Sequence, residues 1–353
     1  EIYTLSLHDA LPISVFAAAA ASGNVIPIDS EQALVNFAKS CSLDTFSQGK
    51  TVQLTGDITL SAKNFTSIPT FGGTFNGNGH TISGLKITKG GSASGLFRYI
   101  QKGGQVMNLN VAGSVELPDE SRETGGIAGI NSGTVSNCTF SGTVTGEEIV
   151  GGIVGLNDTT GVIKNCSTKG KISGRQYAGG VAGKNLGSIF NSGNAMEVDP
   201  VFKNYSLSLD TLSLNDIAAE PGVFTDVGGI TGYSSGIVQY CRNSGKVGYP
   251  HVGYNIGGIA GRQKGYLSDC SNTAGVLGRK DVGGIVGQME PFVLLQYSPD
   301  ALQGLNQRLS DLGGAVNDLT SDAGGSSGTI SGRIAKIIES MNDARSAVHS
   351  LSQ

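Results

Sequence analysis

The stretch from Gly125 to Val144 reads GGIAGINSGTVSNCTFSGTV, and its opening five-residue phrase recurs five more times along the chain. The six copies are GGIAG at Gly125, GGIVG at Gly151, GGVAG at Gly179, GGITG at Gly228, GGIAG at Gly257 and GGIVG at Gly283. Their starts are 26, 28, 49, 29 and 26 residues apart. A fixed period in the twenties is typical of a solenoid, in which one supersecondary unit stacks on copies of itself.

Two adjacent columns of residues recur after each glycine phrase. The later column is expected to form an inward-facing core ladder of Leu85, Leu109, Cys138, Cys166, Ser192, Cys241 and Cys270. The earlier column is expected to form a corner ladder of Gly84, Asn108, Asn137, Asn165, Asn191 and Asp269, with Tyr240 as the exception. Gly, Asn and Asp tolerate the left-handed backbone region best, so the earlier column indicates a turn.

Each unit contains three short runs of alternating apolar residues separated by Gly, Asn and Asp, a pattern that favours short β-strands. At about 3.3 Å per residue, a unit of this length suits one three-sided coil, and stacked coils pair as parallel strands. We therefore predict an all-β, single-stranded parallel β-helix of about nine coils, which spans residues 50–294. Only 15% of residues are charged, which excludes the highly charged disordered class.

The segments before the coils are expected to serve different purposes. Glu1 to Ser14 resembles translated sequencing-adapter sequence, and Val15 to Ala21 resembles the end of a secretory signal peptide, so residues 1–28 are set apart. An Ala-rich linker is the alternative for the second segment. Asp29 to Cys41 predicts an amphipathic helix capped by Asp29 or Ser30, within a capping region 29–49 that covers the open end of the core.

Beyond the coils the hydrophobic period changes to 3 and 4 residues, which predicts two amphipathic helices in residues 295–353 forming a C-terminal helical hairpin. Within the coils, residues 195–222 depart from the repeat and account for its longest spacing. Insertions in solenoids often emerge on the binding face. The candidate binding residues of this insertion are Phe202, Tyr205, Leu209 and Leu212, and a small hairpin covering the coils is the alternative.

The phrases GGIAGINSG and GGIVGLN, followed by Asn-Cys and then Gly-x-Val or Gly-x-Ile, resemble the GLUG-type repeat of secreted and surface proteins of bacteria. The segment Phe71 to Leu85 resembles the first coils of the β-helical regions in some IgA-cleaving metallopeptidases. The resemblance covers residues 30–290. It implies a right-handed, pectin-lyase-like parallel β-helix on an exported protein. It transfers no catalytic residue, because the peptidases' His-Glu-x-x-His motif does not occur in this sequence.

The residues with chemical potential are expected to be structural. Cys138, Cys166, Cys241 and Cys270 are predicted to be buried free thiols, with disulfides or a metal site as less favoured alternatives. The nearest approach to a catalytic cluster is Asp226, Asp281, Arg242, Arg262 and Arg279. His80, in the phrase GNGHTI, is expected in a turn. We predict no catalytic, metal or cofactor site and no cofactor.

The expected function is that of a non-catalytic, exported module for adhesion or spacing, secreted or held on a bacterial cell surface. The alternatives are a β-helical polysaccharide lyase or glycosidase, and the stalk of a larger surface peptidase. The expected partners are a host glycan or protein or other surface proteins. The β-helix itself is expected to be monomeric, with association through the C-terminal helices. A net charge of −4 gives no reason to expect nucleic acid, and no segment is apolar enough to span a membrane.

Overall fold

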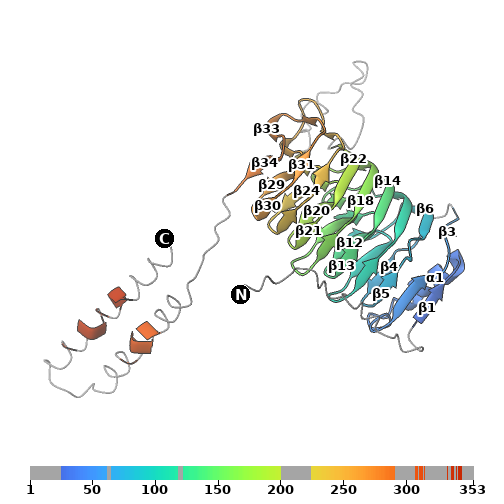
Figure 1. The fold of residues 1–353 in the computed structure, drawn as a ribbon, viewed down its shortest axis with the longest axis horizontal. Helices are drawn as coiled ribbons and strands as arrows, with labels where there is room; N and C mark the ends of the chain where they lie inside the picture. Colours follow the sequence, from blue (N-terminus) through green and yellow to red (C-terminus); the bar gives the residue numbers. More distant parts are fainter. Residues whose placement is uncertain are drawn as a thin grey trace, which may run out of the picture. The chain divides into compact units, whose positions relative to one another are not determined.

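The computed structural model describes residues 25–61, 65–117, 122–199 and 224–290, and residues 307, 308, 310–312, 314, 332, 335–337, 339 and 341–343. The chain divides into two compact units, Glu1–Pro291 and Phe292–Gln353. The first unit is a parallel β-helix, in which four sheets wind around a common core (Figure 1). The fold class predicted from the repeat is confirmed.

Each complete coil contains four strands. One coil consists of β11 (Glu123–Gly125), β12 (Ala128–Asn131), β13 (Thr134–Ser136) and β14 (Thr139–Thr145). Each of these strands pairs in parallel with its counterpart in the next coil; β14, for example, matches β18 (Ser167–Ser173) along its whole length. The expectation of three strands per coil was therefore wrong.

The fourth strand arises because the glycine phrase bends the chain instead of continuing one strand. β11 ends at Gly125 and β12 begins at Ala128, with Ile127 fully buried between them. A Cβ atom on Gly126 would collide with the ring of Phe140 and with the carbonyl oxygen of Gly152 in the next coil. Two glycines are thus required where the bend packs directly against the opposite wall and the coil above.

Two of the four sheets contain nine and ten strands. The A sheet contains β1 (Val25–Ile28), β2 (Thr51–Leu54), β5 (Thr74–Asn76), β9 (Gln105–Met107), β13, β17 (Val162–Lys164), β21 (Ser188–Phe190), β25 (Ile237–Gln239) and β30 (Tyr266–Ser268). The B sheet contains β3 (Ile58–Thr59), β6 (Thr81–Ile87), β10 (Asn110–Glu116), β14, β18, β22 (Gly193–Asp199), β26 (Arg242–Asn243), β31 (Ser271–Asn272), β27 (Val247–Gly248) and β32 (Val276–Leu277).

The other two sheets meet at the glycine bend. The C sheet contains β4 (Ile68–Phe71), β8 (Phe97–Ile100), β12, β16 (Val154–Asn157), β20 (Ala182–Asn185), β24 (Thr231–Ser234), β29 (Ala260–Gln263) and β34 (Val286–Met289). The D sheet contains β7 (Ala93–Ser94), β11, β15 (Val150–Gly151), β19 (Gln176–Gly179), β23 (Thr225–Gly228), β28 (Tyr254–Gly257) and β33 (Lys280–Gly283). The 8-stranded C sheet corresponds to about eight coils, one fewer than expected.

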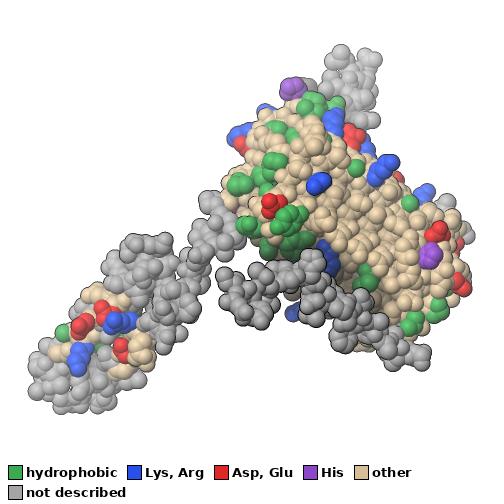
Figure 2. All heavy atoms as spheres, in the orientation of Figure 1, with side chains coloured by type: hydrophobic (Ala, Val, Ile, Leu, Met, Phe, Trp, Pro, Cys, Tyr) green, Lys and Arg blue, Asp and Glu red, His purple; other side chains and the backbone are tan. Residues whose placement is uncertain are grey.

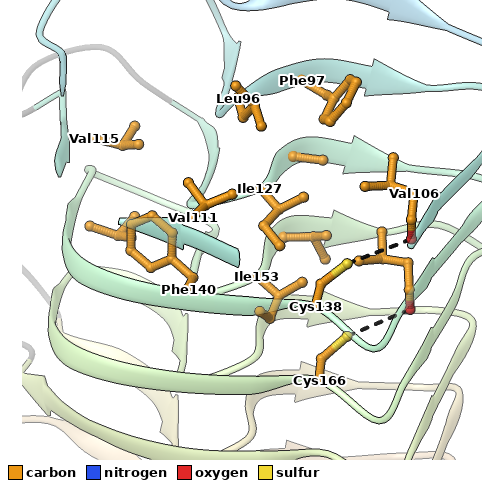
Figure 3. Close-up of a cluster of buried hydrophobic side chains, with 14 of the residues drawn as sticks. Leu96, Phe97, Val106, Val111, Val115, Ile127, Cys138, Phe140, Ile153 and Cys166 are labelled. Carbon is orange, nitrogen blue, oxygen red and sulfur yellow. Dashed lines mark hydrogen bonds between the residues drawn. The ribbon is translucent and has the colours of Figure 1, made fainter. Parts of the chain in front are cut away.

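The core is a continuous apolar column. Side chains from opposite walls meet inside the coils, as Figure 3 shows for Ile127, Phe140 and Ile153. At the first coils the column becomes aromatic, with the rings of Phe71, Phe75 and Phe97 in edge-to-face or tilted contact at centroid distances of 5.3–6.1 Å. Fully buried Ile, Val, Leu and Phe side chains each contribute about 1.5–3 kcal/mol, so this column supplies the main driving force for folding.

One helix covers the N-terminal end of this column. Helix α1 (Glu31–Ser40) begins at Ser30, whose Oγ accepts a hydrogen bond from the Ala33 amide at 3.3 Å. Its Phe37 ring packs 6.1 Å from the ring of Phe71. The predicted capping helix is therefore present. Before it, Val25–Ile28 forms β1, paired in register with β2, so these four residues belong to the fold and not to the leader with which we grouped them.

The insertion begins later than the sequence indicated. Ala195 to Asp199, the first residues assigned to it, continue β22 in full register with β18. The chain rejoins the coil path at Thr225, which pairs with Gln176 of β19. Residues 200–223, including the four candidate binding residues, lie outside the described residues.

In the second unit, every described residue is helical. An ion pair of 2.8 Å between Arg308 Nη1 and Asp343 Oδ2 joins its two segments. Gln307 also donates a hydrogen bond to Asp311 one turn later. These contacts agree with the predicted helical hairpin.

Candidate functional site

The core ladder is made by consecutive coils. The carbonyl oxygens of Leu109, Cys138, Cys166, Ser192 and Cys241 each accept a backbone hydrogen bond from the next coil, at 2.9–3.0 Å. Cys138 and Cys166 lie one above the other inside the coils (Figure 3), and their thiols donate to the carbonyls of Val106 and Val135. These side chains are inside the structure and present no surface to a ligand.

Leu85 and Gly84 do not belong to these columns. Leu85 is buried, but it pairs with Gly113 of the B sheet, while Thr81 and Ile82 pair with Asn110 and Val111. The predicted alignment of this upstream coil was therefore out of register. Its turn at Asn76 to His80 contains extra residues and β6 carries a bulge, and neither irregularity is visible in a weak repeat.

The corner residues adopt the left-handed conformation that their residue types predicted. Asn108, Asn137, Asn165 and Asn191 have φ angles of 44–54°. Their amides form a hydrogen-bonded ladder, in which each side-chain nitrogen donates to the preceding side-chain oxygen at 2.8–3.1 Å. Tyr240 breaks the residue pattern yet keeps the corner, with φ 56°.

Two further ladders are buried, and the sequence analysis missed them. The first runs from Asn131 through Asn157 and Asn185 to Ser234, with side-chain hydrogen bonds of 2.8–3.1 Å. The second runs through Thr168, Asn194, Asn243 and Asn272, each step 2.8 Å long. For the first ladder the signal was a polar residue two positions after most of the glycine phrases, in GINSG, GLN, GKN and GYS. For the second it was a Thr or Asn two positions after the Cys or Ser of the core ladder.

All five cysteines are free. Cys41, Cys138, Cys166 and Cys241 are buried, but Cys270 in the last coil is only half-buried, so the expectation that all four ladder cysteines are buried was wrong at this position. The thiol of Cys241 donates towards the sulfur of Cys270 and lowers the pKa of Cys270 to about 7. Burial raises the pKa of Cys41 to about 12.

The predicted acidic and basic cluster is brought together only in part. Asp226 and Arg262 form a two-pronged ion pair, with Nε–Oδ1 and Nη2–Oδ2 distances of 2.9 and 2.6 Å. Arg279 lies over the ring of Tyr254, at 5.8 Å from its centroid. Arg242 is exposed on the B sheet and Asp281 is exposed on β33.

The carboxylate of Asp226 is fully occupied by this arrangement. Its side chain is 0% exposed, and Oδ1 also accepts a hydrogen bond of 2.8 Å from Asn255. The pKa of Arg262 is raised, chiefly by the hydrogen bond to Asp226. A buried carboxylate held by three donors is a poor general base, because it would have to lose strong charge-assisted bonds before accepting a proton. Its geometry instead fixes the Arg262 guanidinium.

Arg262 belongs to a cluster that we name the tyrosine–cation face, which consists of Tyr177, Lys184, Tyr233 and Arg262 on the C and D sheets. Lys184 pairs in register with Tyr233, and Tyr233 with Arg262. The Lys184 ammonium lies 5.6 and 5.3 Å from the centroids of the Tyr177 and Tyr233 rings, and Arg262 lies 5.8 Å from Tyr233. The two rings meet edge to face at 6.0 Å.

The environment of this cluster is partly desolvated. The pKa of Tyr177 is raised, first by burial and second by the charge of Asp226. All four side chains of the tyrosine–cation face are only half-exposed. Most of the β-helix surface seen in Figure 2 is backbone and side chains that are neither hydrophobic nor charged; charged residues are scattered over it, and hydrophobic side chains gather towards the C-terminal coils.

A variable column of the repeat could have indicated this site. The residue after each glycine phrase points outward and is Ile130, Leu156, Lys184, Tyr233, Arg262 and Gln288 in turn. The column before it is Gly in all six phrases and the column after it is polar in five of six, whereas this column changes from apolar to aromatic and cationic. A position that varies within a packing repeat is not constrained by the packing.

His80 lies in a turn, where its Nδ1 is 3.3 Å from Asp57 Oδ1. The pKa of Asp57 is lowered, mainly because its carboxylate accepts the Thr81 amide. Within the described part of the chain, no three His, Cys, Asp or Glu residues gather into a metal-binding group. None of the helices in that part is long and apolar enough to cross a membrane.

The fold and its repeat define a class of protein, the parallel β-helix assembled from glycine-phrase coils with amide ladders. Residues 121–145 and 146–173 match the family model described as the GLUG motif, so this part of the chain contains two GLUG motifs. The four remaining glycine phrases continue the same sheets, each paired in register with the phrase before it, and are structural copies of the same unit.

One curated relative is similar over part of the chain. It is halomucin of Haloquadratum walsbyi, 38% identical over 86 residues. The match covers 24% of this chain and 1% of halomucin, so the chain spans only a very small part of that relative. No solved structure matches the chain.

Proposed function

We propose that this protein is an exported, non-catalytic module that holds a rigid β-helix at or outside a cell surface, where it serves adhesion or spacing. The observation that carries the proposal is the set of three amide ladders. Each links successive coils by side-chain hydrogen bonds, in addition to the backbone bonds of the sheets. Such ladders rigidify a repeat along its axis, which favours a mechanical role.

The surface location is supported by similarity. GLUG repeats and a partial match to a protein named halomucin are consistent with a surface-type repeat protein. The non-catalytic character is supported by the saturated carboxylate of Asp226, the one acidic residue of the predicted cluster that meets a cation. A lyase or glycosidase would need, on one face, carboxylates or bases that are not already engaged in hydrogen bonds or ion pairs.

The location is tested in the source organism with an antibody against the β-helix. Labelling of intact cells, and loss of that labelling after brief protease treatment, is the expected result. Labelling that requires permeabilised cells would refute export. The catalytic alternative is tested by incubating the purified chain with acidic and neutral polysaccharides. New reducing ends or unsaturated uronic acids would identify an enzyme and refute the non-catalytic proposal.

A further inference from the structure

We propose that the tyrosine–cation face binds an acidic polysaccharide, one that carries carboxylate or sulfate groups on pyranose rings. The inference rests on the proposed function in one respect, because it assumes that the bound polymer is held and not cleaved. The face offers three features to such a polymer: two rings that contact a sugar, a cation that meets its acidic group, and an ion pair that positions a second donor.

The two tyrosines supply an amphipathic platform. Tyr177 and Tyr233 are half-exposed and held edge to face at 6.0 Å, so their relative orientation is set before any ligand arrives. Aromatic rings offer a large apolar contact area at a small cost in conformational entropy, and their hydroxyls remain available as hydrogen-bond partners. Because Lys184 lies over both rings and Arg262 lies over Tyr233, a sugar would meet this platform at the uncovered ring edges and the hydroxyls, which suit the C–H groups and hydroxyls of a pyranose.

Lys184 supplies the charge. Its ammonium lies within 5.6 Å of both ring centroids, and no carboxylate forms an ion pair with it among the residues that the structure describes. A cation held over two rings and without a carboxylate partner keeps its full charge for a ligand. This favours an acidic sugar over a neutral one.

Arg262 supplies a second, pre-oriented donor. Its Nε and Nη2 both donate to the Asp226 carboxylate, which fixes the plane of the guanidinium group. Its Nη1 makes no hydrogen bond among the described residues. The buried Asp226 neutralises the charge of Arg262 but not its capacity to donate a hydrogen bond. The pair therefore adds direction to the site, whereas Lys184 adds net charge.

The spacing suits a polymer. Lys184, Tyr233 and Arg262 occupy the same outward column in three successive coils, so the backbone positions of Lys184 and Arg262 are about 10 Å apart along the axis of the β-helix. That separation is close to the length of a disaccharide unit. A chain lying along the axis would place one ring on the tyrosines and meet both donors.

The acidic neighbours do not oppose this arrangement, because they are themselves paired. Glu147 and Glu148 of the preceding coil lie 3.2 and 3.9 Å from Arg175, and Glu148 also lies 3.4 Å from Arg122. The acidic group whose charge acts on Tyr177 most strongly is Asp226, which Arg262 neutralises. Lys184 thus remains the uncompensated charge of the cluster.

The test is a titration of the whole chain with polygalacturonate, dextran sulfate and neutral dextran by isothermal calorimetry at low salt. Binding to one or both acidic polymers and not to dextran is expected, and the two acidic polymers distinguish carboxylate from sulfate recognition. Lys184→Gln should weaken binding about tenfold, the size of one charge-assisted bond. Tyr233→Ala should weaken it by a similar factor, because the ring platform is lost.

The matched control is Lys169→Gln, which removes an exposed lysine from β18 on the B sheet and should leave affinity unchanged. Thermal melting of each variant shows whether it is folded. If Tyr233→Ala does not fold, Lys184→Gln still tests the site. If both lysine variants weaken binding equally, the polymer binds by non-specific electrostatic attraction, and the proposed site is refuted. Absence of binding, or equal binding of dextran, would also overturn it. Cleavage of a bound polymer would instead refute the non-catalytic function.

Discussion

The buried ladder through Asn131, Asn157 and Asn185 leads to the sharpest prediction. The side chain of Asn157 is 0% exposed. Its nitrogen donates to Asn185 Oδ1 at 2.8 Å and to the Gly161 carbonyl at 3.1 Å, and its oxygen accepts from Asn131 at 2.8 Å. Asn157→Ala removes these three bonds and a fourth, from the same nitrogen to the Ser188 carbonyl at 3.3 Å, and leaves Asn185 Oδ1 buried without its donor.

The magnitude follows from these contacts. A buried polar atom without a partner costs about 1–3 kcal/mol, and the lost side-chain volume adds a cavity term, so the total is about 2–4 kcal/mol. For a β-helix of this size that corresponds to a fall of about 5–15 °C in Tm. The assay is urea and thermal denaturation of the whole chain followed by circular dichroism.

The matched control is Asn165→Gly in the exposed corner ladder. Asn165 has φ 54°, which Gly adopts without strain, and water replaces the lost hydrogen bonds. This variant should lose less than about 1 kcal/mol. If Asn157→Ala costs no more than Asn165→Gly, the buried ladder is not a source of stability and the reasoning is refuted.

Two further predictions concern the bend and the thiols. Gly126→Ala should destabilise the protein by about 2 kcal/mol or more, because its Cβ would collide with Phe140 and the Gly152 carbonyl. The control Gly56→Ala should be neutral, because a Cβ there meets nothing within 4 Å. Equal denaturation midpoints for the two variants would contradict the bend geometry. Cys270 should be the first ladder thiol to react with a disulfide reagent in the native protein. The thiolate is the nucleophile and the pKa is lowered to about 7, so the rate should rise through pH 7 and level off above it. Cys270→Ser should abolish this phase, and a fast phase that persists in that variant would show that a buried thiol is accessible.

The repeat was a good guide to whatever recurs in every coil. The glycine phrases predicted a solenoid, and the Asn column predicted left-handed corners that the structure shows at Asn137 and Asn165. The irregular coil at Leu85 was placed out of register, because a turn with extra residues shifts the pairing without changing the residue types. The right-handed sense of the coils stays a prediction.

The candidate site was accessible from the sequence only in outline. Asp226 and Arg262 were singled out together, but they are 36 residues apart and their ion pair forms across neighbouring coils. Tyr177 and Lys184 were not singled out, although Lys184 stands in an outward column that varies between repeats. Which residues of different columns meet depends on the angle between the C and D sheets, and no periodicity encodes that angle.

The sequence by itself determined the period, the stacking direction and the capping helix. A repeat buries the same positions in every coil, and parallel, in-register pairing is the arrangement that stacks all of these positions on one another. Tertiary structure decided the number of strands per coil, the two buried amide ladders and the tyrosine–cation face. These features arise where side chains from different coils or different sheets come within contact distance. The bend at Gly126, for example, is dictated by a Phe140 ring on the opposite wall and a carbonyl in the coil above.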